Sequence, residues 1–246
     1  MKNFKLTIEY DGTKYKGWQR LGDNDNTIQG KLEKVLCKMT NEKIEVIGCG
    51  RTDAGVHAKN YIANFHTKCQ LSEEMMSNYL YEFLPEDIVV KNIEEVDERF
   101  HSRYNIKSKT YVYKINNNKF RNVFNRKYLY HTSEKLNIEK MKEASKFLIG
   151  THDFQSYTTL KSKKKSTVRT INYINILEKE NNIIEIEFNG DGFLWNMIRI
   201  IVGTLLKVGT GDLKVEKVRE ILKKKKRDEA GPIAQAKALY LEEVIY

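Results

Sequence analysis

The sequence predicts an α+β protein made of two similar sheet-and-helix modules. Both halves of the chain alternate apolar strand patterns with amphipathic helix patterns, and the order of these patterns is comparable in the two halves. No long linker or low-complexity segment lies between the halves. The polar segment 98–109 is the best boundary, so we expect an N-terminal module over residues 1–104 and a C-terminal module over residues 105–246.

The first module contains four predicted strands and two predicted helices. Strand patterns occur at 4–10, 44–48, 60–66 and 87–93. Thr27 is a suitable N-cap for the first helix, whose apolar face consists of Ile28, Leu32, Val35, Leu36 and Met39. The second helix starts at Ser72 and stops before Pro85, because proline lacks the N–H that would continue it.

The second module follows a comparable order. A helix is predicted over 138–148, with Gly150 as its stop, and two further helices near 193–207 and 215–226. Strands are predicted at 111–115, 170–177, 184–188 and 239–245. The segments 170–177 and 184–188 are expected to pair antiparallel, and the second of them alternates apolar and polar residues.

The charge of the chain favours a polyanionic partner. Its 246 residues include 43 lysines and arginines against 33 acidic residues, which gives a net charge of +10. The 14 tyrosines and 10 phenylalanines offer surfaces on which bases can stack. A compositional bias toward lysine and asparagine explains the same charge without any partner. Charge alone therefore does not show that the protein binds a polyanion.

Cysteine and histidine usage indicates no metal site. The cysteines Cys37, Cys49 and Cys69 form no C-x-x-C pair, and the five histidines form no H-E-x-x-H pattern. The residues after Met1 form a strand pattern with no signal-peptide core, and the apolar stretch 198–206 is too short to span a bilayer. We therefore expect a soluble, reduced, cytoplasmic protein that needs no metal.

The segment 48–58 (GCGRTDAGVHA) is the richest in candidate functional residues. Its glycines allow a tight turn and a close approach to a ligand, and they frame Arg51 and Asp53. A carboxylate on such a loop is a candidate catalytic group, although most loop aspartates only satisfy backbone N–H groups. No Gly-Lys-Ser/Thr follows, so the loop is not a cradle for a nucleotide triphosphate.

Two residues of the second module are candidate partners for this loop. Arg199 lies in a helix that is apolar nearly all round, so its guanidinium must either extend to the surface or meet an acceptor such as Asp53, which the pair would keep ionised. Tyr111 lies on a predicted strand. It is either a core residue or a residue that stacks on a base and transfers a proton.

Two clusters of basic residues stand out. The cluster 161–165, which contains Lys163 and Lys164, falls in a predicted loop and suits contact with phosphates. The cluster 223–227 ends a predicted helix, where the helix dipole stabilises cations even if they bind no ligand. We expect the first cluster, more than the second, to bind nucleic acid.

Several segments, in order along nearly the whole chain, resemble the TruA-type family of tRNA pseudouridine synthases. One is RTDAGVHA at 51–58, and another is YDGTKYKGWQ at 10–19. The others are LPEDI at 84–88, YVY at 111–113, GTHDF at 150–154 and GFLWNMIRIIVG at 192–203. A single match of this kind is weak, whereas the agreement of many ordered segments is specific.

The resemblance implies isomerisation of uridine to pseudouridine at positions 38–40 in the anticodon stem-loop of tRNA. It further implies a pseudouridine synthase fold with a largely antiparallel sheet and a central catalytic cleft, a homodimer that holds the tRNA, and no cofactor. It makes Asp53 the catalytic aspartate and Arg199 its ion-pair partner, with Tyr111 stacked on the target base. Arg51, His57, Lys163 and Lys164 are the expected substrate-binding residues.

The chain departs from the family pattern in one late segment. Ile233, Gln235 and Ala238 stand where the family usually has Thr, Pro and Gly, and Trp195 stands where Tyr or His is usual. The choice among tRNA uridines is therefore left open. A non-catalytic RNA-binding or tRNA-folding protein on the same fold is the alternative function, and the joint presence of Asp53, Tyr111 and Arg199 favours the enzyme.

Overall fold

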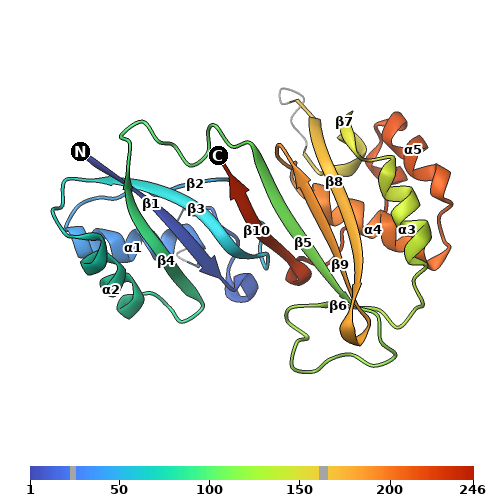
Figure 1. Cartoon of the computed structure of the whole chain (residues 1–246), viewed down its shortest axis with the longest axis horizontal. Coiled ribbons are helices and arrows are strands. Elements are labelled where there is room, and N and C mark those ends of the chain that lie inside the picture. The colour runs from blue at the N-terminus through green and yellow to red at the C-terminus, as the bar shows by residue number, and fades with distance from the viewer. Residues whose placement is uncertain (23–25, 161–165) are drawn as a thin grey trace. The chain divides into compact units, whose positions relative to one another are not determined.

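The computed structural model describes residues 1–22, 26–160 and 166–246, which form two compact units. Unit 1 comprises Met1–Lys107 with Tyr240–Tyr246, and unit 2 comprises Ser108–Leu239. The described residues contain ten strands and five α-helices, and most strand pairs are antiparallel (Figure 1). This arrangement confirms the α+β class. Unlike the predicted module 105–246, unit 2 lacks the last strand, because that strand pairs within unit 1.

The sheet of unit 1 is organised around strands β1 and β3. Strand β1 (Lys2–Tyr10) pairs antiparallel with β3 (His57–Thr67) and with β4 (Ile88–Val96). Strand β10 (Leu239–Ile245) runs parallel to β3, and the short β2 (Ile47–Gly48) pairs antiparallel with it. Phe4, Leu6 and Ile8 on one face of β1 are buried, as the alternation of a strand requires.

The predicted strand 44–48 is shortened to Ile47–Gly48, and side chains of helix α1 (Ile28–Thr40) explain why. The Val46 N–H donates to Glu33 Oε1 at 3.1 Å, and Gln29 Nε2 donates to Val46 O at 3.0 Å. These bonds occupy backbone groups that a strand would give to its neighbour. Ile44 and Val46 are buried nonetheless, which is the pattern that suggested a strand.

The helices of unit 1 begin as predicted. The Gly30 N–H donates to the Thr27 hydroxyl at the start of α1, and the Met75 N–H donates to the Ser72 hydroxyl at the start of α2 (Glu73–Phe83). Each bond satisfies one of the free N–H groups of a helix N-terminus. Helix α2 ends at Phe83. The next residue, Leu84, has an extended backbone and precedes Pro85. It packs against α1 and β4.

The sheet of unit 2 has β9 (Ile183–Gly190) between β5 (Ser108–Asn116) and β8 (Val168–Lys179), both antiparallel to it. Two short strands were not predicted. Strand β7 (Gly150–Asp153) pairs antiparallel with β8, and β6 (Tyr130–His131) runs parallel to β5. Both are too short, and β7 too polar, to show an alternating pattern.

Three helices lie beside this sheet (Figure 1). They are α3 (Ile138–Lys146), α4 (Met197–Thr210) and α5 (Val215–Lys224), and α3 contacts both of the others. Helix α4 starts four residues later than predicted because Asn196 has a left-handed backbone, with φ of 60°. Such a residue stands outside a right-handed helix.

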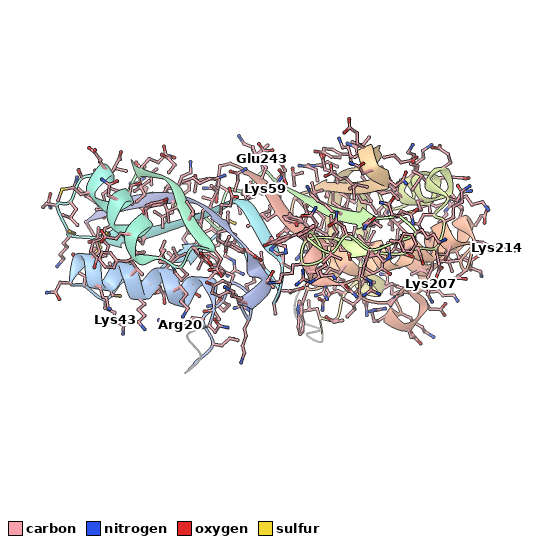
Figure 2. All side chains as sticks on the ribbon, turned by 90° about the horizontal axis from the view of Figure 1, so that it is seen from below. Arg20, Lys43, Lys59, Lys207, Lys214 and Glu243 are labelled. Atoms are coloured by element: carbon pink, nitrogen blue, oxygen red, sulfur yellow. The ribbon has the colours of Figure 1, made fainter. Side chains whose placement is uncertain are left out.

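Short 3-10 turns complete both units. They are η1 (Gly12–Lys14), η2 (Gln155–Tyr157), η3 (Glu180–Asn182), η4 (Arg227–Glu229) and η5 (Ala236–Ala238). Cationic side chains such as Lys43 in unit 1, and Lys207 and Lys214 in unit 2, extend outward (Figure 2). Within the described ranges, no helix has the length and apolar character needed to cross a membrane.

Candidate active site

The loop between β2 and β3 carries Asp53 on a backbone that is tied at several points. The Trp18 N–H donates to Thr52 O at 3.1 Å, and the Thr52 hydroxyl shares a 2.8 Å hydrogen bond with the Tyr10 hydroxyl. The Val56 N–H donates to Asp53 O at 3.2 Å and closes the turn, in which Gly55 has a φ of 78°. Asp53 is the first residue of this turn and is partly exposed.

Glycines of the segment 10–19 allow the close approach of this segment to the Asp53 loop. A Cβ at Gly12 would lie 2.0 Å from Val56 O, and one at Gly17 would lie 2.5 Å from Thr52 O. Gly17 also has a φ of 95°, a backbone angle that residues other than glycine rarely adopt. The N-terminal segment therefore acts as a clamp that fits only if both positions lack a side chain.

Aromatic packing holds the first part of the same loop. Trp18 stacks on Tyr61 with ring centroids 3.9 Å apart, and the Tyr61 hydroxyl donates to Gly50 O. The next residue, Arg51, is exposed, and its Nε donates to Gln19 Oε1 at 3.2 Å. Gly50 and Thr52 are thus both fixed, while the side chains of Arg51 and Asp53 stay accessible.

His57 lies at the start of β3, and only 2% of it is exposed. Its Nδ1 lies 3.1 Å from Gly12 N, whose N–H it accepts when the nitrogen is unprotonated, and 3.0 Å from Asp11 Oδ1. The ring stacks on Tyr240 of β10 with centroids 4.8 Å apart. This burial leaves little of the imidazole for a ligand, so its contacts favour a role in positioning the Asp11–Gly12 turn.

Tyr111 and Arg199 both belong to unit 2. Tyr111 lies on β5 opposite Phe188 of β9, and it meets the ring of Phe193 edge-on at 5.4 Å. It is partly exposed, whereas Tyr113 two residues later is fully buried. Phe193 thus orients the Tyr111 ring while part of the ring stays accessible.

Arg199, in the first turn of α4, is oriented by neighbours on two sides. Its Nε donates to Ala234 O at 2.7 Å, and its Nη1 donates to Asn196 Oδ1 at 2.9 Å. The Ala234 N–H donates back to Arg199 O at 3.0 Å. The predicted ion pair with Asp53 would join the two units, and it stays a prediction.

Close backbone packing explains why Ala234 is in place. A Cβ at Gly203 of α4 would lie 1.9 Å from Pro232 O, so the segment after η4 rests directly on the helix. The Gly231 N–H donates to the Thr204 hydroxyl at 2.9 Å. Lys163 and Lys164, the two lysines predicted to bind phosphate, lie outside the described residues.

Reasoning from the sequence did not assign the residues that support the loop. Tyr10, Trp18 and Tyr61 resemble ordinary apolar strand and turn residues, and the glycines at 12 and 17 are the one signal in the sequence that could have pointed to a close approach. Asn196 was also missed, since its left-handed backbone has no periodic signature. In the described part of the chain, no three His, Cys, Asp or Glu side chains are grouped as metal ligands would be.

The fold and these residues define an α+β protein that presents a carboxylate on a clamped loop in one unit and an oriented guanidinium in the other. A family model described as tRNA pseudouridine synthase matches residues 6–105 and 144–246. The chain belongs to this family.

Individual relatives are similar over their full length. A protein of Clostridium tetani named tRNA pseudouridine synthase A 1 is 61% identical over 246 residues, which cover all of both chains. A protein of Bacillus cereus named tRNA pseudouridine synthase A 2 is 52% identical over 99% of both chains. One of Bacillus sp. KSM-64, named tRNA pseudouridine synthase A, is 49% identical over all of both chains.

Proposed function

We propose that this chain isomerises uridine to pseudouridine in tRNA, with Asp53 as the catalytic group. The observation that supports this most is the Asp53 loop: hydrogen bonds from Tyr10, Trp18 and Tyr61 hold it, while the carboxylate stays partly exposed. Fixed backbone with an accessible reactive group is the preorganisation that catalysis requires. Relatives named tRNA pseudouridine synthase A match the whole chain.

The reaction is an isomerisation with balanced atoms. The N1–C1′ bond of the uridine breaks, the uracil rotates, a C5–C1′ bond forms, and the proton leaves C5 while N1 gains one. No net oxidation or hydrolysis takes place. Asp53 either attacks C1′, attacks C6, or assists departure of the base through a glycal, and the target base must leave the stack to reach it.

The other site residues have distinct proposed roles. Tyr111 stacks on the target base and accepts the C5 proton, since its ring is held edge-on by Phe193 and remains partly accessible. Arg199, oriented by Ala234 and Asn196, pairs with the Asp53 carboxylate. Arg51 contacts the flipped nucleotide, and Lys163 and Lys164 contact phosphates.

We further propose that the modified uridines lie at positions 38–40 of the anticodon stem-loop, as the family resemblance implies. In this proposal the enzyme acts in the cytoplasm as a homodimer whose subunits together hold the tRNA. The net charge of +10 supports a polyanionic substrate.

Release of tritium from C5-labelled uridine in unmodified tRNA tests this function. We expect release by the wild type and a loss of at least ~10³-fold in Asp53→Asn, a size typical of losing an essential catalytic group. Asp228→Asn is the matched control, because Asp228 is an exposed aspartate of η4 in unit 2.

Three outcomes would contradict the proposal in different ways. Absence of release by the wild type, with tRNA bound, would favour the non-catalytic RNA-binding alternative. Equal release by Asp53→Asn would refute the role of Asp53. Release from uridines outside the anticodon stem-loop would refute the proposed positions.

A further inference from the structure

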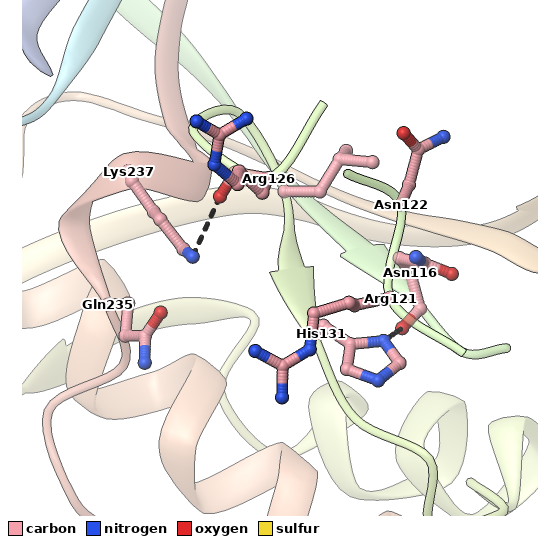
Figure 3. A pocket seen from close by; sticks show the side chains of 8 residues that line it. Asn116, Arg121, Asn122, Arg126, His131, Gln235 and Lys237 are labelled. Atoms are coloured by element: carbon pink, nitrogen blue, oxygen red, sulfur yellow. Dashed lines mark hydrogen bonds between the residues drawn. The ribbon is translucent and has the colours of Figure 1, made fainter. Parts of the chain in front are cut away.

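Unit 2 contains a pocket of about 320 Å³ that the proposed reaction does not use. Its walls come from the end of β5, the loop 117–129, β6 and the segment around η5 (Figure 3). A volume of this size is at the lower end of the range for small-molecule sites.

The lining of the pocket suits an anion. Arg121, Arg126 and Lys237 contribute three cations, and Asn116, Asn122 and Gln235 contribute amides. None of the described lining residues is acidic. Arginine and amide N–H groups together are the donors that phosphate oxygens favour.

Hydrogen bonds hold two walls of the pocket together. Lys237 Nζ donates to Arg126 O at 2.8 Å, so the η5 segment is tied to the loop (Figure 3). The Arg126 guanidinium donates to Val123 O at 2.7 Å within the loop. Arg121, by contrast, makes no hydrogen bond or ion pair with another described residue, and its guanidinium can bind a ligand without losing a protein contact.

The pocket is continuous with the segment that orients Arg199. Gln235 lines the pocket, and its carbonyl accepts a hydrogen bond from the Tyr113 hydroxyl at 3.0 Å. The carbonyl of the preceding residue, Ala234, accepts a hydrogen bond from Arg199 Nε. One short segment therefore carries both an acceptor for the proposed catalytic arginine and a wall of the pocket. Gln235 is also one of the residues at which this chain departs from the family pattern.

Exposed aromatic rings on the same loop indicate which anion fits. Phe120 is 76% exposed and Phe124 is 91% exposed, and both are close in sequence to Arg121. Surfaces that bind unpaired RNA usually combine two features: cations that bind the RNA backbone, and aromatic rings nearby on which the bases stack. A small inorganic anion would make no use of the rings.

We propose that this pocket binds a backbone phosphate of the RNA substrate, with Arg121 as its principal ligand and the neighbouring base stacked on Phe120 or Phe124. The proposal rests on the proposed function for the identity of the RNA. It assigns to the loop 117–129 a part in substrate recognition, outside the residues predicted from the sequence.

The test compares Arg121→Ala with Lys127→Ala. Lys127 is an exposed cation of the same loop that does not line the pocket, so both variants lose one positive charge. Binding of unmodified tRNA is measured by fluorescence anisotropy at several salt concentrations. We expect Arg121→Ala to weaken binding ~5- to 10-fold and to reduce the slope of log affinity against log salt by about 1, as loss of one phosphate contact does. Lys127→Ala should change affinity less than ~2-fold.

A second measurement localises the contact to a phosphate. A series of tRNAs, each with one neutral methylphosphonate, is titrated with wild type and with Arg121→Ala. One position should weaken binding by the wild type but leave Arg121→Ala unaffected, because the same contact is already lost. Arg121→Lys, which keeps the charge, should restore part of the affinity.

Several results would overturn the proposal. These are equal affinities of Arg121→Ala and Lys127→Ala, no methylphosphonate position that depends on Arg121, or a change of oligomeric state in Arg121→Ala that accounts for the lost affinity. Binding of inorganic phosphate that depends on Arg121 but leaves the affinity for tRNA unchanged would indicate a site for the free anion instead. Tritium release by the wild type is followed in parallel, so failure of the isomerase function is distinguished from failure of the pocket.

Discussion

At the scale of single residues, the position of Asp53 depends on residues that have no reactive group. The loop is held by backbone and hydroxyl contacts from Tyr10, Trp18 and Tyr61, and the close approach is possible only because residues 12 and 17 are glycines. These residues belong to segments far apart in sequence. Their effect on activity is therefore one of geometry, which predicts that small changes of shape will matter more than changes of charge.

Gly17→Ala tests this geometry. Alanine at a φ of 95° costs about 1 kcal/mol in backbone strain, and its Cβ would in addition push against Thr52 O. We expect kcat to fall at least ~10-fold, because a misplacement of about 1 Å at a reactive group has effects of this order or larger. Tritium release and thermal unfolding are measured together.

Gly211→Ala is the matched control for this substitution. Gly211 has a φ of 90°, and a Cβ added there would meet no heavy atom within 4 Å. The control therefore carries the same backbone strain without the clash, and it should lower thermal stability while leaving kcat near that of the wild type. Equal activity losses in the two variants would show that strain alone, and not the clamp, explains the effect.

At the scale of elements, the N-terminal half of α4 and the segment 231–234 act together to orient Arg199. The helix starts late, after left-handed Asn196, whose side chain accepts from the guanidinium. Direct contact at Gly203 brings Ala234 within reach of Arg199 Nε. The guanidinium thus meets protein acceptors within its own unit, in addition to any partner in the substrate or in unit 1.

Gly203→Ala should separate these two elements. A Cβ there would lie 1.9 Å from Pro232 O, a backbone atom that has no freedom to rotate away. We expect a loss of ~1–3 kcal/mol in the free energy of unfolding, typical of overpacking, and a clear fall in activity. Gly209→Ala on the same helix meets only side chains, Met141 Sδ at 2.7 Å and Leu136 Cδ2 at 3.0 Å, and because side chains can move, its effect should be smaller. Denaturant unfolding and tritium release are measured for both variants. A stable, fully active Gly203→Ala would refute the proposed role of the contact between α4 and the segment 231–234.

Prediction from sequence succeeded where local signals and the final contacts agree. The helix starts at Thr27 and Ser72 were predicted because capping is a local interaction, and both caps are present. The strand 44–48 was predicted too long because Gln29 and Glu33, distant in sequence, take its backbone bonds. The role of Ala234 had no signature at all, since it depends on a carbonyl and a contact with Gly203. Asp53, Tyr111 and Arg199 were candidates from the residues alone, family resemblance gave them their roles, and their mutual geometry stays a prediction.

At the scale of the whole molecule, buried tyrosines link stability to pH. Tyr113 and Tyr157 are fully buried, and burial raises the pKa of both hydroxyls far above the ordinary value. Nearby Tyr130 adds to the effect on Tyr113, and the positive charge of Arg199 partly opposes it. In each case the folded protein keeps a proton that the unfolded chain releases.

The sign of the resulting pH dependence follows from this difference. Below about pH 10, both states carry the proton and the stabilisation is complete; above it, the unfolded state ionises first, so the free energy of unfolding falls by up to ~1.4 kcal/mol per pH unit for each such tyrosine. We expect the decline to be shallower in Tyr113→Phe than in Tyr104→Phe, where Tyr104 is 63% exposed. Denaturant unfolding between pH 8 and about pH 11.5 measures it, and identical slopes in the two variants would contradict the assignment.

The parallel pairing of β10 with β3 has a consequence for the order of events during synthesis. Tyr240, which stacks on His57 beside the Asp53 loop, leaves the ribosome only after all of unit 2 has been made. At ordinary elongation rates this delay is on the order of 10 s. Throughout that time unit 1 lacks one of its strands, so a nascent chain or a fragment that stops short of β10 would hold the Asp53 loop beside an unfinished sheet. The sheet that carries the Asp53 loop is therefore complete only after β10 has been translated.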